Sequence, residues 1–168
     1  KGGDPFLYGR GGEEVAACRA AGVPVDVVPG VTSALSGPLA AGIPVTHRGT
    51  VGAVLVTNGH DGLSASALAA VRDGEATLVV LMAVANLAEV TATLLAAGAD
   101  PATPAAVIER ATTPRQRVTR APLTDLAAEC AARGVRAPGV VVIGAVAAEA
   151  LLDPTAFLDA AALSEVAS

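Results

Sequence analysis

The first twelve residues carry a cluster of glycines that could bring the backbone close to a ligand, because glycine has no Cβ. They are Gly2, Gly3, Gly9, Gly11 and Gly12. A phosphate ligand is disfavoured: GxxxxGK[ST] is absent, and GxGxxG fails because Glu14 stands at its last glycine. Glu13 and Glu14 also place two carboxylates where a helix N-terminus would hold an anion. The loop is therefore either a plain structural turn or a loop for a ligand without phosphate.

Basic residues gather in one segment of an acidic chain. Eleven Lys and Arg face sixteen Asp and Glu, and the net charge of −5 argues against a general nucleic-acid binder. Four of the arginines are Arg110, Arg115, Arg117 and Arg120. Their spacing favours a solvated strand face, and contact with an anionic ligand is the alternative.

The two cysteines and the apolar stretches indicate packing rather than chemistry. Cys18 and Cys130 lie in Ala-rich helical patterns without CxxC or a His pair, which predicts two buried thiols in a reducing cytoplasm and no metal site. The uncharged stretch 27–46 is interrupted by Pro and Gly, so no membrane span is expected, and no signal peptide is visible. The chain opens on Lys1 and its single methionine is Met82, so we expect a fragment, a processed product or an incomplete sequence.

The elements that must position these residues alternate between helix and strand. Hydrophobic periodicity and Gly or Pro boundaries predict helices at 13–21, 32–41, 63–71, 86–97 and 124–133, and a helical tail from 145. Strands are expected at 23–28, 52–57 (buried), 77–82, 105–109, 116–120 and 140–143. This alternation predicts a layered α/β protein. The short link between 105–109 and 116–120 predicts an antiparallel pair, and hence a mixed sheet.

Four segments, in this order, resemble the tetrapyrrole methylase family, and within it the uroporphyrinogen-III C-methyltransferases. They are KGGDPFLYGRGGEE (1–14), VPGVTSALSGPLAAGIPVTHRG (28–49), TLVVLMAV (77–84) and VIERATTPRQRV (107–118). The resemblance implies two α/β domains with S-adenosylmethionine between them. Residues 1–30 would end the first domain, and 31–168 would form the second with its helical tail. Family members carry a GPGDP-type loop and proton-transfer residues further toward the N-terminus, so whether this chain is active alone is left open.

The same resemblance implies which residues contact the cofactor, S-adenosylmethionine or its product S-adenosylhomocysteine. They are Gly2, Gly3, Asp4, Leu7, Thr32, Ser33, Met82, Ala111 and Gly139. Small residues and exposed backbone suit a ligand with a flat adenine, hydroxyls and a zwitterionic end. Met82 could instead fill the core. Family members often have Gly after this Met, and the methyl group of Ala83 is expected to tighten the pocket.

The implied substrate is uroporphyrinogen III, methylated at two ring carbons to give precorrin-2 for siroheme or cobalamin synthesis. Its eight carboxylates require cations, and the matched motifs offer Arg10, His47 and Arg48 as substrate-binding residues. His47 could instead be a loop histidine with local partners. No residue is assigned as the catalytic base. The alternatives are a sister precorrin methyltransferase and a folded, non-catalytic remnant, and the resemblance implies a cytoplasmic homodimer that binds neither nucleic acid nor membrane.

Overall fold

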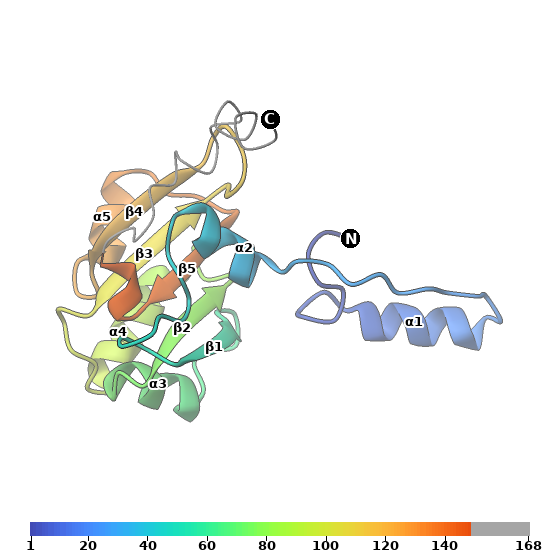
Figure 1. The fold of residues 1–168 in the computed structure, drawn as a ribbon, viewed down its shortest axis with the longest axis horizontal. Coiled ribbons are helices and arrows are strands. Elements are labelled where there is room, and N and C mark those ends of the chain that lie inside the picture. Colours follow the sequence, from blue (N-terminus) through green and yellow to red (C-terminus); the bar gives the residue numbers. More distant parts are fainter. Residues whose placement is uncertain (149–168) are drawn as a thin grey trace, which may run out of the picture.

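The computed structural model describes residues 1–148, which form an extended N-terminal arm and a compact α/β body (Figure 1). The arm, residues 1–31, contains a loop, helix α1 (Gly11–Ala20) and a returning extended segment. Helix α2 (Ser33–Ala40) then begins the body. The later helices are α3 (Ala65–Arg72), α4 (Leu87–Ala96) and α5 (Leu126–Ala132), and a short 3-10 turn covers Ala145–Ala147.

Within the described residues, five strands form one mixed sheet, as the sequence predicts. The strands are β1 (Ala53–Asn58), β2 (Ala76–Leu81), β3 (Pro104–Glu109), β4 (Arg117–Pro122) and β5 (Gly139–Ile143). Their order is β1-β2-β5-β3-β4. Only the β1–β2 pair of this sheet is parallel, and the predicted antiparallel pairing of β3 with β4 is confirmed. The last strand, β5, thus lies at the centre.

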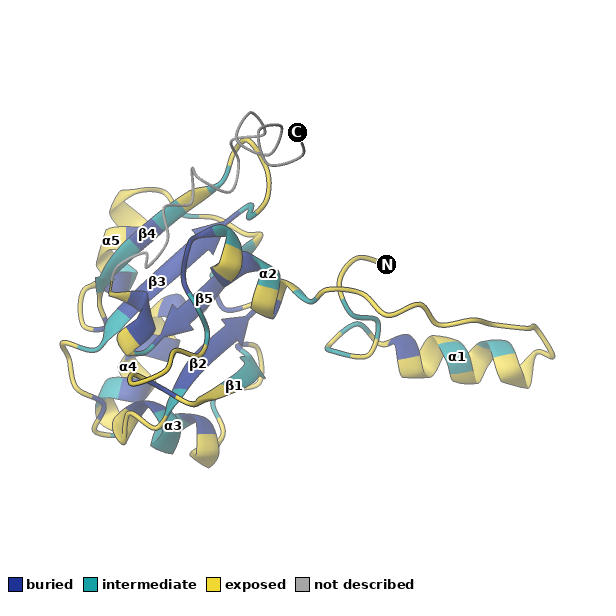
Figure 2. Cartoon of the chain, viewed as in Figure 1, coloured by how far each residue is buried: buried dark blue, intermediate teal, exposed yellow. Residues whose placement is uncertain are grey.

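The sheet separates two apolar layers because successive side chains of a strand point to opposite faces. Leu78, Val80, Val141 and Ile143 pack in one cluster with α3, α4 and α5. Val79, Leu81, Val140 and Val142 pack in the other with α2 and the 3-10 turn. The central strands are therefore buried while the arm is largely exposed (Figure 2).

Several predictions about the elements and the cysteines need correction. The strand expected at 23–28 pairs with no strand of residues 1–148, and its valines are exposed, because periodicity alone supplies no hydrogen-bonding partner. The strand expected to be buried at 52–57 is β1, an edge strand whose first residues are exposed. Of the two cysteines, Cys130 is buried but Cys18 is only half-buried on α1. The helical tail begins as a 3-10 turn, and its continuation lies outside the described residues.

Candidate functional site

A cavity of about 930 Å³ lies between the arm loop and the body. Its walls come from the glycine-rich loop, the start of α2, the segments that follow β1, β2 and β3, and the residues at the start of β5. Segments that follow strand carboxyl ends commonly form ligand sites in open α/β sheets. The fold therefore gathers six segments that are distant in the sequence around one space.

All nine residues that the resemblance implies for the cofactor border this cavity. They are Gly2, Gly3, Asp4, Leu7, Thr32, Ser33, Met82, Ala111 and Gly139. The chemistry of such a wall is mostly backbone and small side chains. It suits a ligand that is bound by shape and by peptide hydrogen bonds.

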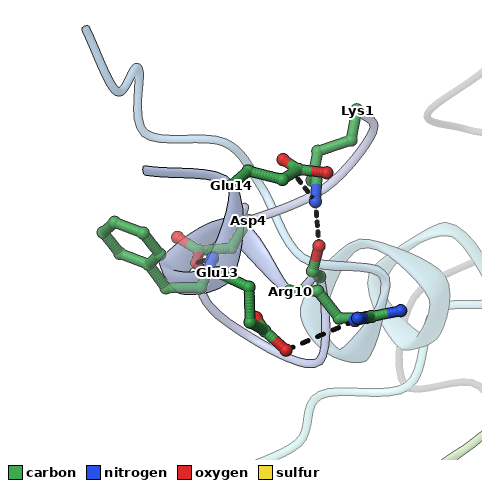
Figure 3. A network of polar contacts seen from close by, with 7 residues as sticks. Lys1, Asp4, Arg10, Glu13 and Glu14 are labelled. Atoms are coloured by element: carbon green, nitrogen blue, oxygen red, sulfur yellow. Dashed lines mark hydrogen bonds and ion pairs between the residues drawn. The ribbon is translucent and has the colours of Figure 1, made fainter. Parts of the chain in front are cut away.

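The arm loop is shaped by its own polar groups. Oδ1 of Asp4 accepts hydrogen bonds from the backbone N–H of Phe6 (2.8 Å) and Leu7 (3.1 Å), which closes an Asx-turn. Nζ of Lys1 donates to the Gly9 carbonyl and forms an ion pair of 2.8 Å with Glu14 (Figure 3). These contacts fold the loop back onto the start of α1.

Close packing of two glycines joins the loop to the entrance of α2. A Cβ on Gly30 would lie 2.2 Å from the carbonyl oxygen of Gly3, so no larger residue fits at this position. Gly3 itself has φ = 72°, in the left-handed region. The turn before α2 therefore fixes where the glycine-rich loop meets the cavity.

Helix α2 presents its capped N-terminus to the cavity. The hydroxyl of Thr32 accepts a hydrogen bond from the backbone N–H of Ala34 (3.2 Å), so Thr32 is the N-cap of this helix. Thr32 and Ser33 are thereby held at the cavity wall.

Replacement of Thr32 by alanine is expected to lower the free energy of unfolding by about 1 kcal/mol, because the cap is lost. Thr32→Ser keeps the hydroxyl and should change it by much less. Urea unfolding of both variants measures the difference. Equal stability of the two variants would contradict the assigned cap.

Strained backbone also concentrates at this site. Among residues 1–148, five non-glycine residues have positive φ, and four of them line the cavity: Tyr8 (53°), Met82 (57°), Arg110 (46°) and Thr112 (64°). Such conformations persist where the surrounding structure enforces them, and they cluster at functional sites. Met82 is 42% exposed, so its interpretation as core filler is wrong. No sequence pattern predicts these backbone conformations.

The residue after Met82 does not tighten the cavity as expected. Ala83 is fully buried in the core and is absent from the cavity wall. Its methyl group faces Gly59, where an added Cβ would lie 2.7 Å away. The left-handed turn at Met82 precedes this residue, and Ala83 packs against the segment that follows β1.

The turn after β3 is tied to α2 by one side chain. Oε1 of Gln116 accepts from the Thr112 N–H (2.8 Å), and its Nε2 donates to the Ala40 carbonyl (2.8 Å). Arg120 donates to the neighbouring Ala41 carbonyl (3.0 Å). Two side chains from the β4 region therefore satisfy carbonyls at the C-terminus of α2, which are otherwise left without helical partners.

Arg117 is half-exposed and has a structural partner. Its Nη2 lies 2.7 Å from Oε1 of the buried Glu109, which also accepts from the Arg136 N–H at 2.9 Å. Burial acts to raise the pKa of Glu109, but these hydrogen bonds and the nearby guanidinium charges outweigh it, so the pKa of this carboxyl is lowered. The pair links β3 and β4 to the segment before β5.

The three residues expected to bind substrate do not meet in the cavity. Arg10 lies outside it, with its side chain exposed and paired with Glu13 at 3.3 Å (Figure 3). His47 and Arg48 line a separate hollow of about 430 Å³ in the turn closed by backbone hydrogen bonds between His47 and Val51. A role of these three residues in substrate binding stays a prediction.

Sequence reasoning singled out neither Tyr8 nor His60 of the cavity wall. It gave contact with an anionic ligand only as the alternative for Arg110 and Arg115, which also line the cavity. The four-arginine segment was the one available signal, but spacing alone could not separate these two arginines from Arg117.

Over residues 1–148, no cluster of three His, Cys, Asp or Glu side chains could hold a metal ion. No helix in the part of the chain that the structure describes is long and apolar enough to cross a bilayer.

Comparisons with known proteins agree with this arrangement. The family model of the tetrapyrrole (corrin/porphyrin) methylases matches residues 1–127. A siroheme synthase of Tolumonas auensis is 44% identical over 151 residues, 88% of this chain and 32% of that protein. A uroporphyrinogen-III C-methyltransferase of a Sinorhizobium species is 41% identical, over 87% of this chain and 54% of that protein.

The crystal structure of the uroporphyrin-III C-methyl transferase of Thermus thermophilus complexed with S-adenosylhomocysteine superposes with a TM-score of 0.70. It is 41% identical and covers 87% of this chain and 64% of that one. The chain thus spans between a third and two thirds of the length of these relatives.

Proposed function

Because the chain belongs to the tetrapyrrole methylase family, we propose that its cavity binds S-adenosylmethionine for C-methylation of uroporphyrinogen III to precorrin-2. The observation that carries this proposal is the convergence of nine residues, implied by resemblance alone, on a single cavity. A relative of 41% identity was solved with S-adenosylhomocysteine, which supports the same ligand here.

The cavity has the properties that this ligand needs. Its volume of about 930 Å³ falls within the usual range for small-molecule sites, on the order of 300–1,000 Å³. Gly139 packs closely against Val84, which an added Cβ would meet at 2.9 Å, so this part of the wall does not accept a larger residue. Thr32 and Ser33 add hydroxyls at the start of α2.

The proposed reaction is an in-line displacement in which a ring carbon of the substrate attacks the methyl group that the sulfonium of S-adenosylmethionine supplies. The ring carbon is electron-rich, so the residues of this chain contribute chiefly by alignment and by excluding water. The glycine loop, the capped start of α2 and the turn at Met82 are the elements that set the alignment. No described residue is assigned to remove the ring proton.

The remaining expectations are part of the same proposal. Residues 1–30 would complete a first domain and residues 31–168 a second, with the product entering siroheme or cobalamin synthesis in the cytoplasm. A homodimer is proposed, supported by apolar side chains exposed near the junction of arm and body, such as Val28 (78%), Val31 (72%) and Leu39 (60%). Sedimentation of only monomer at micromolar concentration would contradict the dimer.

Calorimetric titration with S-adenosylhomocysteine tests the proposed function first. We expect saturable binding with one site per chain. Incubation with S-adenosylmethionine and uroporphyrinogen III should give a product heavier by two CH2 units, because each added methyl group is balanced by the loss of one proton. Absence of heat at millimolar ligand would support a folded remnant without cofactor. Cofactor binding combined with methylation of a later precorrin, but not of uroporphyrinogen III, would support a sister methyltransferase.

A further inference from the structure

The cavity carries positive charge although the whole chain carries −5. Arg110 and Arg115 line it, and Asp4 is the one acidic residue among the described residues of its wall. One carboxylate oxygen of Asp4 is already engaged by two backbone N–H groups of its own loop. The ligand-facing charge of the wall is therefore cationic.

The backbone of Arg110 is fixed while its side chain is unengaged. Its N–H donates to the Pro138 carbonyl (3.1 Å), and its own carbonyl accepts from the Thr113 hydroxyl (2.8 Å). Its φ of 46° lies in the left-handed region, where a non-glycine residue is held only by its surroundings. Within residues 1–148 the guanidinium makes no hydrogen bond or ion pair, unlike that of Arg117.

Arg115 lies on the same anchored turn. Its N–H donates to the Thr113 hydroxyl (3.2 Å), and the next residue, Gln116, ties the turn to α2. In the described part of the chain its guanidinium has no acceptor. Two arginines are thus held by one anchored turn at one cavity, and neither forms an ion pair with a carboxylate of residues 1–148.

We propose that Arg110 and Arg115 form a binding site for ligand carboxylates in this cavity. A guanidinium presents parallel N–H donors that match a carboxylate, and this pairing strengthens where water is partly excluded. The proposal rests on the proposed function, which offers two carboxylate sources: the tetrapyrrole side chains and the amino-acid end of the cofactor. Unlike Arg10, His47 and Arg48, both arginines line the cavity that the predicted cofactor positions border.

The test compares the variant Arg110→Gln/Arg115→Gln with the control Arg19→Gln/Arg133→Gln, which removes the same charge from two exposed arginines outside the cavity. Fluorescence titration measures the affinity for uroporphyrin III, a stable oxidised form of the proposed substrate with the same carboxylates. Calorimetry measures the affinities for S-adenosylhomocysteine and for 5′-methylthioadenosine, which lacks the amino-acid end. Far-UV circular dichroism checks that both variants are folded.

If the arginines bind substrate, the cavity variant loses about tenfold or more in affinity for uroporphyrin III while S-adenosylhomocysteine binding is unchanged. If they bind the cofactor, the affinity for S-adenosylhomocysteine falls by a similar factor, and the affinity for 5′-methylthioadenosine does not change. Either result supports a carboxylate site and names its source. If the control variant loses as much as the cavity variant, or neither loses affinity, the site is overturned while the proposed function stands. If the wild-type chain binds neither ligand, the proposed function fails and this site fails with it.

Discussion

Replacement of Gly30 by alanine is expected to weaken S-adenosylhomocysteine binding by about 10- to 100-fold. The added Cβ would lie 2.2 Å from the Gly3 carbonyl oxygen, so the glycine-rich loop must move away from α2. Overpacking of this kind costs about 1–3 kcal/mol, and each 1.4 kcal/mol is about tenfold in affinity. Calorimetric titration of the Gly30→Ala variant measures this loss of affinity.

Gly12→Ala is the matched control in the same arm. Nothing lies within 4 Å of a Cβ at Gly12, which is in the first turn of α1, so the substitution should leave affinity unchanged. It should also favour the helix slightly, by up to about 1 kcal/mol. If Gly30→Ala binds as tightly as Gly12→Ala, the glycine-rich loop does not position the ligand.

Replacement of Arg117 by alanine is expected to lower the free energy of unfolding by about 3 kcal/mol at pH 7. The change leaves the buried carboxylate of Glu109 without its guanidinium, and breaking a buried pair in this way typically costs about 3–5 kcal/mol. The lower end applies because the Arg117 side chain is half-exposed. Urea unfolding measures the loss.

The loss of unfolding free energy caused by Arg117→Ala is expected to depend on pH. The pKa of Glu109 is lowered in the wild-type fold, so its stabilising contribution is present above the unfolded pKa, about 4.3, and is lost as pH falls through the folded value. Removal of Arg117 takes away the largest influence that lowers this pKa, so Glu109 of the variant takes up its proton at a higher pH than in the wild type. The difference in unfolding free energy between variant and wild type should therefore shrink as the pH falls through the range between the two folded-state pKa values. A gap that stays constant down to pH 3 would contradict the ion pair.

Arg133→Ala is the control for this pair. Arg133 lies 3.3 Å from Glu129 on the surface of α5, and both side chains are about half-exposed. Exposed pairs of this spacing contribute about 0.5 kcal/mol or less. A loss as large as that of Arg117→Ala would show that the removed charge, and not the buried pair, sets the stability.

The sequence predicted the body well because its elements combine periodic burial with clear end signals. Leu87, Val90 and Leu94 mark one face of α4, and Gly98 follows its end. Burial along β1 and pairing of the 23–28 segment were not predictable, because both depend on which neighbours a strand has. Local patterns contain no information on such partners.

The cofactor positions of the site were predicted from resemblance to a family, and not from hydrophobic periodicity and end signals as the body was. The nine cofactor positions came from resemblance, whereas composition left the glycine loop open between a turn and a ligand loop. The left-handed backbone at Met82 and Arg110 is imposed by the surrounding fold and has no local signal. Membership in a matched motif also did not tell which side chains line the cavity: Arg10 lies outside it, and Arg115, for which contact with an anionic ligand was only the alternative, lies in its wall.

The most direct measurement of the central claim is an amide NMR titration of the labelled chain with S-adenosylhomocysteine. The account predicts that signals of Gly3, Thr32, Met82 and Ala111 shift together with one dissociation constant, while those of the 46–52 turn stay in place. Shifts confined to that turn, or spread over the surface without these four residues, would contradict the account.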